Sequence, residues 1–309
     1  MGVLVLALNP SIDAEWRVDG VQWEEKNTIQ AERRWAGGKG INVARWLRHL
    51  GDQPCLLLPL GGDTGAELAR YLREEKFSTR IVSVREASRV NTIVSTASQG
   101  QLRFNQSGPE LSRAELRAIL EETSRLTGKA SCVVLSGSLP RGVPADVYGR
   151  ITKRACRAGV KTILDCDGEA LRAAVGAHPF LVKPNAHELA QWSGRKLGSE
   201  ASLLSAARGL SKATRGWVLV SRGPAGGLLV NDREGATFYA RPPRLKAVHT
   251  IGAGDAMVAA VAQQIEAGAG PAEWLRWGVA AGSAATQCVA GKLPRRGLVE
   301  AILARIIPE

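Results

Sequence analysis

Short apolar runs alternate with segments of helical periodicity over most of the chain, and this alternation constrains the fold more than any other feature. Residues 3–8 (VLVLAL) form a continuous apolar run that ends at NPS, as expected of a buried strand. Residues 41–51 (INVARWLRHLG) place apolar side chains at helical spacing before a glycine that ends the helix. Further strands are expected at 55–60, 132–137, 161–165, 180–185 and 217–223. Further helices are expected at 64–75, 112–126, 144–158 and 200–210. Because strand alternates with helix, the sequence predicts an α/β fold with a mainly parallel, helix-flanked sheet, followed by a mostly helical region after residue 254.

Two segments interrupt this alternation. Residues 14–35 and 90–104 alternate polar and apolar side chains, which is typical of half-exposed antiparallel strands. The second contains Gln99-Gly100-Gln101, a sequence suited to a hairpin turn. We expect lid strands inserted at about 14–36 and 88–105 in a single domain over residues 1–309. An irregular loop excursion is the alternative.

Composition narrows the class of protein. Hydrophobic residues make up 45% and charged residues 23% of the 309, which is ordinary for a soluble globular protein. No stretch approaches the roughly 20 apolar residues of a membrane span. The N-terminus lacks the basic region of a signal peptide, so we expect a cytoplasmic protein without a membrane partner.

The net charge of +12 raises the question of nucleic-acid binding. The basic residues are dispersed at spacings of three or four, which suits solvated helix faces, so we expect no nucleic-acid partner. A positive field around a pocket for phosphorylated small molecules explains the positive sign of the net charge equally well. The five cysteines form no CxxC pair and the four histidines no HExxH, which disfavours a disulfide framework and a zinc site.

The motif HTIGAGDAM (249–257) places an acid where a glycine turn enters a helix of small apolar residues. Gly252 and Gly254 permit a tight turn, and the first N–H groups of the helix would hold an anion, most often a phosphate. Small side chains such as Ala253 leave room for it. A carboxylate beside bound phosphate costs repulsion unless it has another task, and Asp255 could accept a proton from an attacking hydroxyl. A plain helix N-cap is the alternative.

The motif WAGGKGINVA (35–44) is a second glycine cluster at a helix start. Gly37 and Gly38 let the backbone approach a ligand, Lys39 carries a charge suited to phosphate, and Asn42 could hydrogen-bond a sugar hydroxyl. A turn followed by a helix cap is the alternative. Neither glycine motif completes GxGxxG, and no GxxxxGK[ST] occurs, so the usual dinucleotide and Walker A loops are absent from the sequence.

Seven motifs occur in the order found in the ribokinase-like sugar kinases, often called the PfkB family: NPSID, AGGKGINVAR, GGDTG, SGSLPRG, KPNAHEL, VSRGPAGG and HTIGAGDAM. The chain resembles most the phosphorylated-hexose branch, which comprises 1-phosphofructokinase, tagatose-6-phosphate kinase and the minor 6-phosphofructokinase. The resemblance runs from residue 9 to residue 286, about nine tenths of the chain. It implies a Rossmann-like α/β domain with a β-sheet lid that often pairs in a homodimer, and ATP-dependent phosphorylation of a sugar hydroxyl.

The resemblance also implies roles for individual residues. Asp255 matches the catalytic base, and the backbone of Gly252, Ala253 and Gly254 matches the anion hole. The residues implied in sugar-phosphate binding are Asp13, Lys26, Gly37, Gly38, Lys39, Asn42, Arg89, Arg103 and Ser138. Those implied along the nucleotide are Lys183, Asn185, Ser221, Gly223, Gly226 and Ser283.

Several of these assignments have structural alternatives. Asn185 and Glu188 resemble the NxxE motif, in which Glu188 and Asn185 organise Mg²⁺ through water and phosphate, but the same pair fits a helix capping box. Ser283 lies in AAGSAA, which could pack beside adenine or could be ordinary helix packing. Asp13 could be a turn cap, and each of Lys26, Arg89 and Arg103 could be solvated lid charge.

The identity of the sugar rests on a few residues. Arg89 matches the phosphate-binding arginine of the branch, and Lys39 in GGKG resembles the 1-phosphofructokinase and tagatose-6-phosphate kinase pattern. Arg103 resembles the minor 6-phosphofructokinase, while FNQSGPE and DCDG depart from the family, leaving Asp167 without a role. We favour fructose 1-phosphate over tagatose 6-phosphate or fructose 6-phosphate. A kinase of an unphosphorylated sugar or nucleoside, or a non-catalytic sugar-phosphate sensor, is the remaining alternative.

Overall fold

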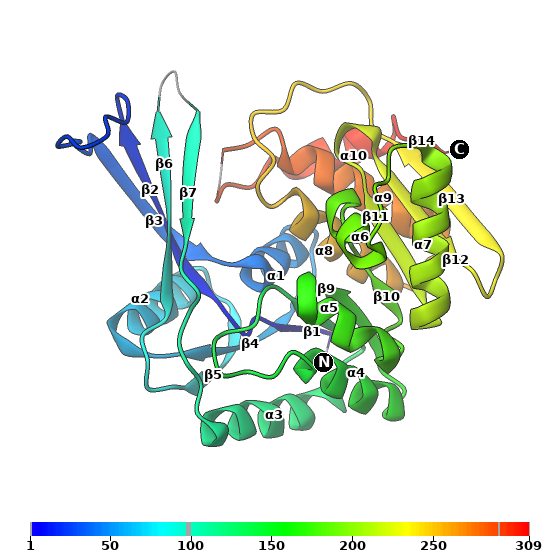
Figure 1. Ribbon diagram of the computed structural model, residues 1–309, viewed down its shortest axis with the longest axis horizontal. Coiled ribbons are helices and arrows are strands. Elements are labelled where there is room, and N and C mark those ends of the chain that lie inside the picture. The colour runs from blue at the N-terminus through cyan, green and yellow to red at the C-terminus, as the bar shows by residue number, and fades with distance from the viewer. Residues whose placement is uncertain (1, 97–99, 290, 309) are drawn as a thin grey trace.

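The computed structural model describes residues 2–96, 100–289 and 291–308, and within these ranges a sheet of ten strands spans the molecule (Figure 1). Its order is β14-β13-β12-β11-β10-β9-β8-β1-β4-β5. The strands from β5 to β11 pair in parallel, and β12, β13 and β14 pair antiparallel at one edge. The strands are β1 (Val3–Leu6), β4 (Cys55–Leu60), β5 (Ser78–Ser83), β8 (Cys132–Ser136), β9 (Lys161–Asp165), β10 (Leu181–Val182), β11 (Trp217–Ser221), β12 (Gly227–Asn231), β13 (Ala236–Arg241) and β14 (Ile307–Pro308). The predicted α/β class is confirmed.

Helices cover both faces of the sheet because successive strand side chains point in opposite directions. Val3 and Val5 pack into one buried cluster, whereas Leu4 and Leu6 pack into the other. The first cluster is covered by α1 (Lys39–His49), α2 (Gly62–Glu74), α8 (Ala253–Glu266), α9 (Pro271–Ala285) and α10 (Arg296–Leu303). The second is covered by α3 (Arg113–Thr127), α4 (Val147–Arg157), α5 (Gly168–Ala174), α6 (Ala186–Ser193) and α7 (Glu200–Thr214). No helix within the described ranges is long and apolar enough to cross a lipid bilayer.

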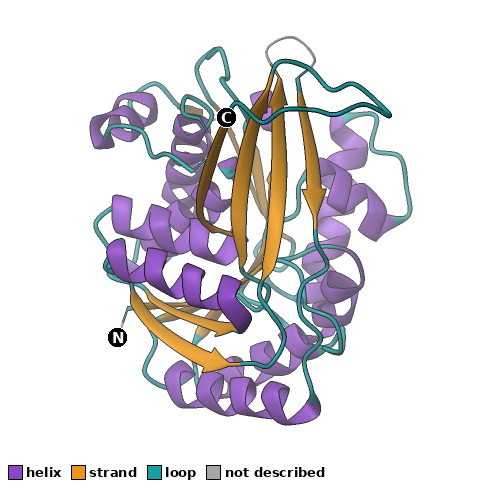
Figure 2. Cartoon of the chain, turned by 90° about the vertical axis from the view of Figure 1, so that its left-hand side faces the viewer, coloured by secondary structure: helices purple, strands orange, loops and turns teal. Residues whose placement is uncertain are grey.

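A second sheet stands away from the first, and Figure 2 shows it facing the viewer. It has the order β3-β2-β6-β7 and consists of β2 (Ser11–Val18), β3 (Ala31–Gly37), β6 (Arg89–Thr96) and β7 (Gln101–Asn105). These strands occupy the two segments predicted to interrupt the strand–helix alternation, so the small sheet is confirmed. We call it the lid sheet.

The pairing within the lid sheet differs in one respect from the predicted antiparallel arrangement. The outer pairs β2–β3 and β6–β7 are antiparallel, but the central pair β2–β6 is parallel. The chain passes through β3, α1, β4, α2 and β5 between β2 and β6, so β6 enters the lid sheet from the same end as β2. The predicted turn falls partly outside the described residues, which exclude Gln99. Gly100 has φ +82° and its carbonyl accepts a hydrogen bond from the Thr96 amide.

Most predicted elements are present, and the differences concern one interior strand and the strands toward the two edges of the sheet. The expected strand over 180–185 is reduced to β10, because Lys183 and the residues that follow it lead into α6. The sequence does not predict β5, β12, β13 or the two-residue β14. In β5 the side chains are mostly exposed and polar, so the apolar run that identifies a buried strand is missing.

Helix α1 begins in direct contact with the end of β1. A Cβ atom at Gly40 would lie 2.6 Å from Cβ and 2.9 Å from Cα of Ala7. Gly40 is therefore required for close packing rather than for backbone freedom. This contact fixes the start of α1, which carries Lys39 and Asn42.

We predict that Gly40→Ala destabilises the protein although alanine is the better helix former. Overpacking at this contact should cost about 1–3 kcal/mol of unfolding free energy. Gly209→Ala in α7 is the matched control, since a Cβ there would meet only the Trp192 ring, at 3.9 Å. The control should be stabilised by up to about 1 kcal/mol through helix propensity. Urea denaturation measures both, and equal midpoints for the two variants would contradict the packing argument.

Candidate active site

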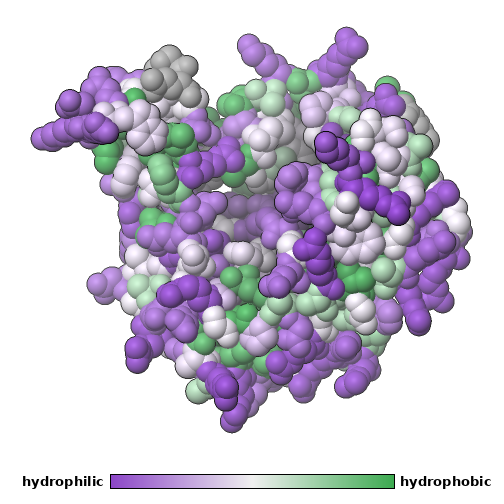
Figure 3. Space-filling view, in the orientation of Figure 1, coloured by the Kyte–Doolittle hydropathy of each residue, from purple (hydrophilic) through white to green (hydrophobic). Residues whose placement is uncertain are grey.

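A pocket lies between the lid sheet, α1 and the start of α8, where the surface in Figure 3 is hollowed. Asp13 and Trp35 line it from the lid sheet, Asn42 from α1, and Gly252 from the turn before α8. The carboxyl ends of β1, β9 and β10 lead into the same region. Ligands of open α/β sheets bind outside the carboxyl ends of the strands, so this pocket is the candidate site.

Asp255 lies in the first turn of α8 and is buried. Asn42 Nδ2 donates a hydrogen bond of 2.8 Å to Asp255 Oδ2, which joins residues 213 positions apart in the sequence. Burial, reinforced by the negative charge of Asp165, raises the pKa of Asp255 to about 6, although Lys39 and the Asn42 hydrogen bond oppose the shift. A buried carboxylate with a pKa near neutrality has the properties of a general base.

The turn before α8 has the backbone geometry that the glycines predict. Gly252 is the N-cap residue and has φ +80°. The Ala253 amide donates a long hydrogen bond of 3.4 Å to the Thr250 carbonyl, whereas the helix N-terminus characteristically leaves its first amides without partners inside the helix. A Cβ at Gly254 would lie 3.4 Å from the ammonium nitrogen of Lys183, so that ammonium lies directly beside the turn.

Lys183 and Lys39 converge on a carboxylate that the sequence analysis missed. Asp165, the last residue of β9, has its Oδ1 atom 3.2 Å from Lys183 Nζ and 3.5 Å from Lys39 Nζ. The negative charge of Asp165 is the main cause that raises the pKa of Lys39 well above its usual value. Burial alone would raise the pKa of Asp165, but the two lysines hold it below its usual value. Its position at the carboxyl end of a predicted strand is the sequence signal for Asp165, whereas Asp167, the unexplained acid of DCDG, is exposed.

Asp13 lies over the backbone of Gly37. Its Oδ1 atom accepts hydrogen bonds from Ser11 Oγ (2.8 Å) and Asn91 Nδ2 (3.1 Å), and burial raises its pKa. A Cβ at Gly37 would lie 2.2 Å from the carboxyl group, so only glycine fits there. Gly38 is the N-cap of α1, with φ +94°. Asp13, Gly37, Gly38, Lys39 and Asn42 are thus brought together as the motifs predict.

Arg89 lies at the base of the lid sheet with its guanidinium held by backbone carbonyls. Nε and Nη2 donate to the Asn9 carbonyl (3.1 and 2.9 Å), and Nη1 donates to the Gln106 carbonyl (3.0 Å). These bonds use three of its five N–H donors and fix the plane of the group. Ser138 is nearby, since its Oγ atom accepts a hydrogen bond of 3.1 Å from Asn9 Nδ2.

The other two predicted lid cations are less constrained. Arg103 is exposed on β7. The pKa of His249, which lines the pocket, is lowered chiefly by burial, and the charge of Arg103 adds to that shift. Lys26 is exposed in the segment between β2 and β3. No ion pair involving Lys26 or Arg103 is formed within the described part of the chain, and the structure does not bring Lys26 together with the pocket residues.

Asn185 and Glu188 form the capping box that was the structural alternative for this motif. Asn185 Oδ1 accepts from the Glu188 amide, and Glu188 Oε2 accepts from the Asn185 amide, both at 2.8 Å. The carboxylate of Glu188 still lies close enough to the site to raise the pKa of Lys39. Ser221, at the end of β11, forms a bridge with Asn185, which brings the KPN and SRG motifs together.

The remaining predicted nucleotide residues also have packing roles. Gly226 has φ +84°, and a Cβ there would lie 2.0 Å from the Ala240 carbonyl, so this glycine allows the approach of β13. Gly223 has φ +56° and starts a short turn of helix. Ser283 Oγ donates within α9 to the Val279 carbonyl (2.7 Å). A Cβ at Gly282 would lie 3.1 Å from the Ala253 carbonyl, so this stretch of small residues packs α9 onto the start of α8.

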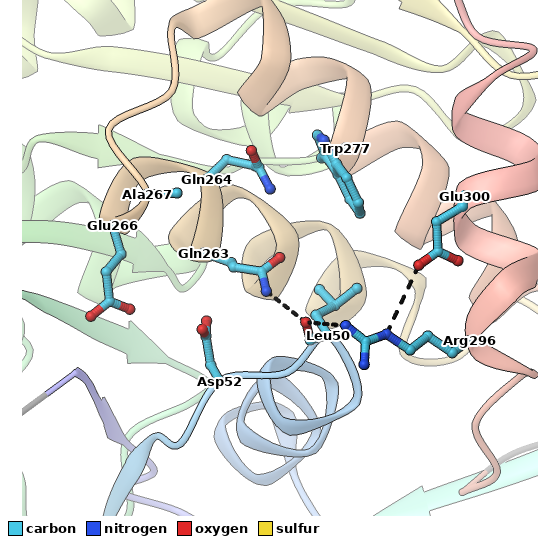
Figure 4. A pocket seen from close by; sticks show the side chains of 9 residues that line it. All are labelled: Leu50, Asp52, Gln263, Gln264, Glu266, Ala267, Trp277, Arg296 and Glu300. Carbon is cyan, nitrogen blue, oxygen red and sulfur yellow. Dashed lines mark hydrogen bonds and ion pairs between the residues drawn. The ribbon is translucent and has the colours of Figure 1, made fainter.

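A second hollow lies at the C-terminal ends of α1 and α8, and Figure 4 shows the residues that line it. Gln263 from α8 donates there to the Leu50 carbonyl at the end of α1 (2.8 Å), with Asp52 and Arg296 beside it. None of the predicted site residues lines this hollow. Among the described residues, no group of three or more His, Cys, Asp or Glu side chains could hold a metal ion.

Comparison with known proteins agrees with this arrangement. The chain is 36% identical to a 1-phosphofructokinase of Xanthomonas campestris pv. campestris, covering 84% of this chain and 82% of that protein. It is also 36% identical to the ATP-dependent 6-phosphofructokinase isozyme 2 of Escherichia coli, covering 92% of each. The crystal structure of phosphofructokinase-2 from Escherichia coli in complex with potassium superposes with a TM-score of 0.92 at 34% identity, over 99% of this chain and 98% of that one.

Residues 7–295 match the model of the pfkB family carbohydrate kinases. That span includes the glycine turn with Asp255, the lid sheet and the residues at the carboxyl ends of the strands. The chain belongs to the pfkB family of carbohydrate kinases.

Proposed function

We propose that the protein transfers the γ-phosphoryl group of ATP to a hydroxyl of a ketohexose phosphate, converting fructose 1-phosphate to fructose 1,6-bisphosphate. The relative from Xanthomonas campestris that carries the name 1-phosphofructokinase supports this substrate. The equally similar relative named 6-phosphofructokinase isozyme 2 supports fructose 6-phosphate as the alternative. Tagatose 6-phosphate remains a third substrate of the same chemical class.

The observation that carries the proposal is the buried Asp255 carboxyl beside the glycine turn, with its pKa near 6. In its ionised form Asp255 accepts the proton of the sugar hydroxyl while that oxygen bonds to the γ-phosphorus. The bond between the γ-phosphorus and the bridging oxygen then breaks, and ADP leaves. Asn42 orients the base through its hydrogen bond to Oδ2.

Charge on the transferring group would be stabilised from two sides. The backbone of Gly252, Ala253 and Gly254 supplies N–H groups and the positive end of the α8 dipole. Lys183, buried next to Gly254, and Lys39, at the start of α1, supply full positive charges. The turn, the lysines and the base thus surround one small volume, as phosphoryl transfer requires.

The sugar phosphate would lie between the lid sheet and α1. Asp13 and Asn42 face this space and suit sugar hydroxyls, while the backbone at Gly37 and Gly38 permits close approach. The two N–H donors of Arg89 outside its carbonyl bonds suit a phosphate. The further contributors in this proposal are Lys39, Arg103 and Ser138, whereas Lys26 lies outside the pocket and is left out of it.

ATP would extend from the glycine turn toward β11. The residues proposed along it are Lys183, Asn185, Ser221, Gly223, Gly226 and Ser283. Mg²⁺ bound with ATP would neutralise charge on the β- and γ-phosphate oxygens. Glu188 fits an indirect role, because the capping box uses only one of its two carboxylate oxygens. The single side-chain oxygen of Asn185 accepts the cap hydrogen bond, so its NH₂ group would donate to water or phosphate. An ion held mainly by phosphates and water needs few protein ligands.

The lid sheet presents an exposed apolar surface that we propose as a homodimer interface of this single kinase domain. Trp23 is 80% exposed and Phe104 is 57% exposed, and Leu102 and Ile29 are also exposed. Leu102 and Phe104 lie two residues apart on β7 and therefore share one face. Large exposed apolar surface on a soluble protein characteristically marks an interaction site.

We predict that Phe104→Asp converts a dimer to a monomer in sedimentation velocity. A charged residue in an apolar interface must be desolvated without a partner, which weakens association. Ile81→Asp, at an equally apolar exposed position on β5, is the control and should leave the oligomeric state unchanged. A wild-type monomer at micromolar concentration, or a dimer that survives Phe104→Asp, would contradict the interface.

A coupled assay tests the proposed reaction with fructose 1-phosphate, fructose 6-phosphate, tagatose 6-phosphate, ribose and adenosine, each with and without Mg²⁺. We expect the highest kcat/KM with fructose 1-phosphate and no turnover without Mg²⁺.

Asp255→Asn should lower kcat by roughly 10²–10⁴, the usual range for a positioned base, while ATP binding measured by calorimetry persists. Preference for ribose or adenosine, or near-normal turnover of Asp255→Asn, would refute the proposal.

For Arg89→Ala we expect a raised KM for the sugar phosphate with an unchanged KM for ATP. Loss of a charge-assisted phosphate contact of about 1.5–3 kcal/mol corresponds to a change of roughly 10- to 150-fold. Arg89→Lys keeps the charge but lacks the planar fork, so it should recover only part of the affinity. Steady-state kinetics measures both variants, and an unchanged KM in Arg89→Ala would move the phosphate site elsewhere.

A further inference from the structure

Asp165 is a charged residue at the centre of the site with no role in the mechanism above. It is the last residue of β9 and is 1% exposed. Its Oδ1 atom faces Lys183 at 3.2 Å and Lys39 at 3.5 Å, and its Oδ2 atom accepts a hydrogen bond of 3.1 Å from Ser136 Oγ. Both oxygens are therefore held by groups from three different elements of the fold.

The two lysines depend on Asp165 to different degrees. The side chain of Lys183 is only 4% exposed, so water cannot compensate its charge, whereas that of Lys39 is 35% exposed. A buried ammonium without a counter-ion is strongly destabilised. Asp165 is therefore the counter-ion of Lys183 and holds its ammonium beside Gly254.

The negative charge of Asp165 also reaches the proposed base. It raises the pKa of Asp255, second only to burial, while Lys39, the hydrogen bond from Asn42, and Lys183 lower it. If Asp255 is ionised, the charges of these two carboxylates and two ammonium groups sum to zero. Arrival of a phosphoryl group then adds negative charge next to the two ammonium groups, of which that of Lys183 is buried.

We propose that Asp165 is a positioning residue for phosphoryl transfer, which fixes Lys183 against the glycine turn and leaves the more exposed Lys39 able to reach the substrate. The inference rests on the proposed kinase function and adds a role for the carboxyl end of β9. Asp165 acts through the lysines and does not itself touch the reacting atoms.

Asp165→Asn is the central test, because asparagine keeps the size of the side chain and its hydrogen bond with Ser136 but removes the charge. Misplacement of Lys183 by about 1 Å should cost about 10²-fold in kcat. The acid limb of the kcat/KM profile, near pH 6 in the wild type, should move to lower pH, since the charge that raises the pKa of Asp255 is gone. A purely structural defect would lower the rate at every pH without moving the limb.

Asp167→Asn is the matched control, two residues along the same segment. It removes an exposed carboxylate and leaves the Asp165 contacts in place, so kcat and the acid limb should stay close to wild type. The ionisation of the substrate phosphates is the same for both variants and cannot produce a difference between them.

A double-mutant cycle separates positioning from loss of folding. In a Lys183→Met background the further effect of Asp165→Asn on kcat should be less than a third of its effect in the wild type, because the residue to be positioned is absent. Additive effects, or a wild-type kcat and pH limb in Asp165→Asn, would overturn the inference. Failure of the kinase proposal itself would be distinguishable, since the wild type would then turn over none of the phosphosugars.

Discussion

The packing of α8 between α1 and α9 determines the rest of the site. Residues 255–262 of α8 are buried almost without interruption, so the helix has no exposed face over its first turns. Small side chains allow the neighbouring helices to approach closely, as Gly278 and Gly282 do from α9. An ionisable group at the start of such a helix is desolvated by the same packing that stabilises the fold. The reactivity proposed for Asp255 is thus a consequence of the core.

The site also requires that elements distant in the sequence end at the same place. Asn9, just after β1, connects them: its carbonyl accepts from Arg89, and its amide nitrogen donates to the Ser107 carbonyl (2.9 Å) and to Ser138. A Cβ at Gly108 would lie 2.1 Å from Asn9 Oδ1, so the chain leaving the lid sheet passes directly over this side chain. The base of the lid sheet and the main sheet are therefore joined through one short polar segment.

The sequence predicts the main features of the fold because buried parallel strands and amphipathic helices carry strong local patterns. It predicts Asp255 and Asn42 at one pocket because glycine motifs mark the turns that place them, and Asp13 because NPSID follows the first strand in the order of the family motifs. It misses Asp165, because the importance of that carboxylate arises from two lysines that are distant in sequence. It also misses the parallel pairing of β2 with β6, since alternation within a strand gives no information on the direction of its neighbour. For Asn185 and Glu188 the pattern left two interpretations open, and the capping box is formed while any role toward Mg²⁺ stays a proposal.

The parallel pair at the centre of the lid sheet has a mechanical consequence. The lid sheet consists of two hairpins, β2–β3 and β6–β7, and both ends of each hairpin continue into the main domain. Pairing of β2 with β6 joins the hairpins along eight residue pairs. Bending one hairpin alone would shear that whole ladder of hydrogen bonds. The large displacement with the lowest energy is a rigid-body rotation of all four strands about an axis through the ends that join the main domain. Such a rotation would displace Arg89, Asp13 and Arg103 by amounts that grow with their distance from that axis. Arg103 would therefore move furthest and Arg89, at the root of β6, least.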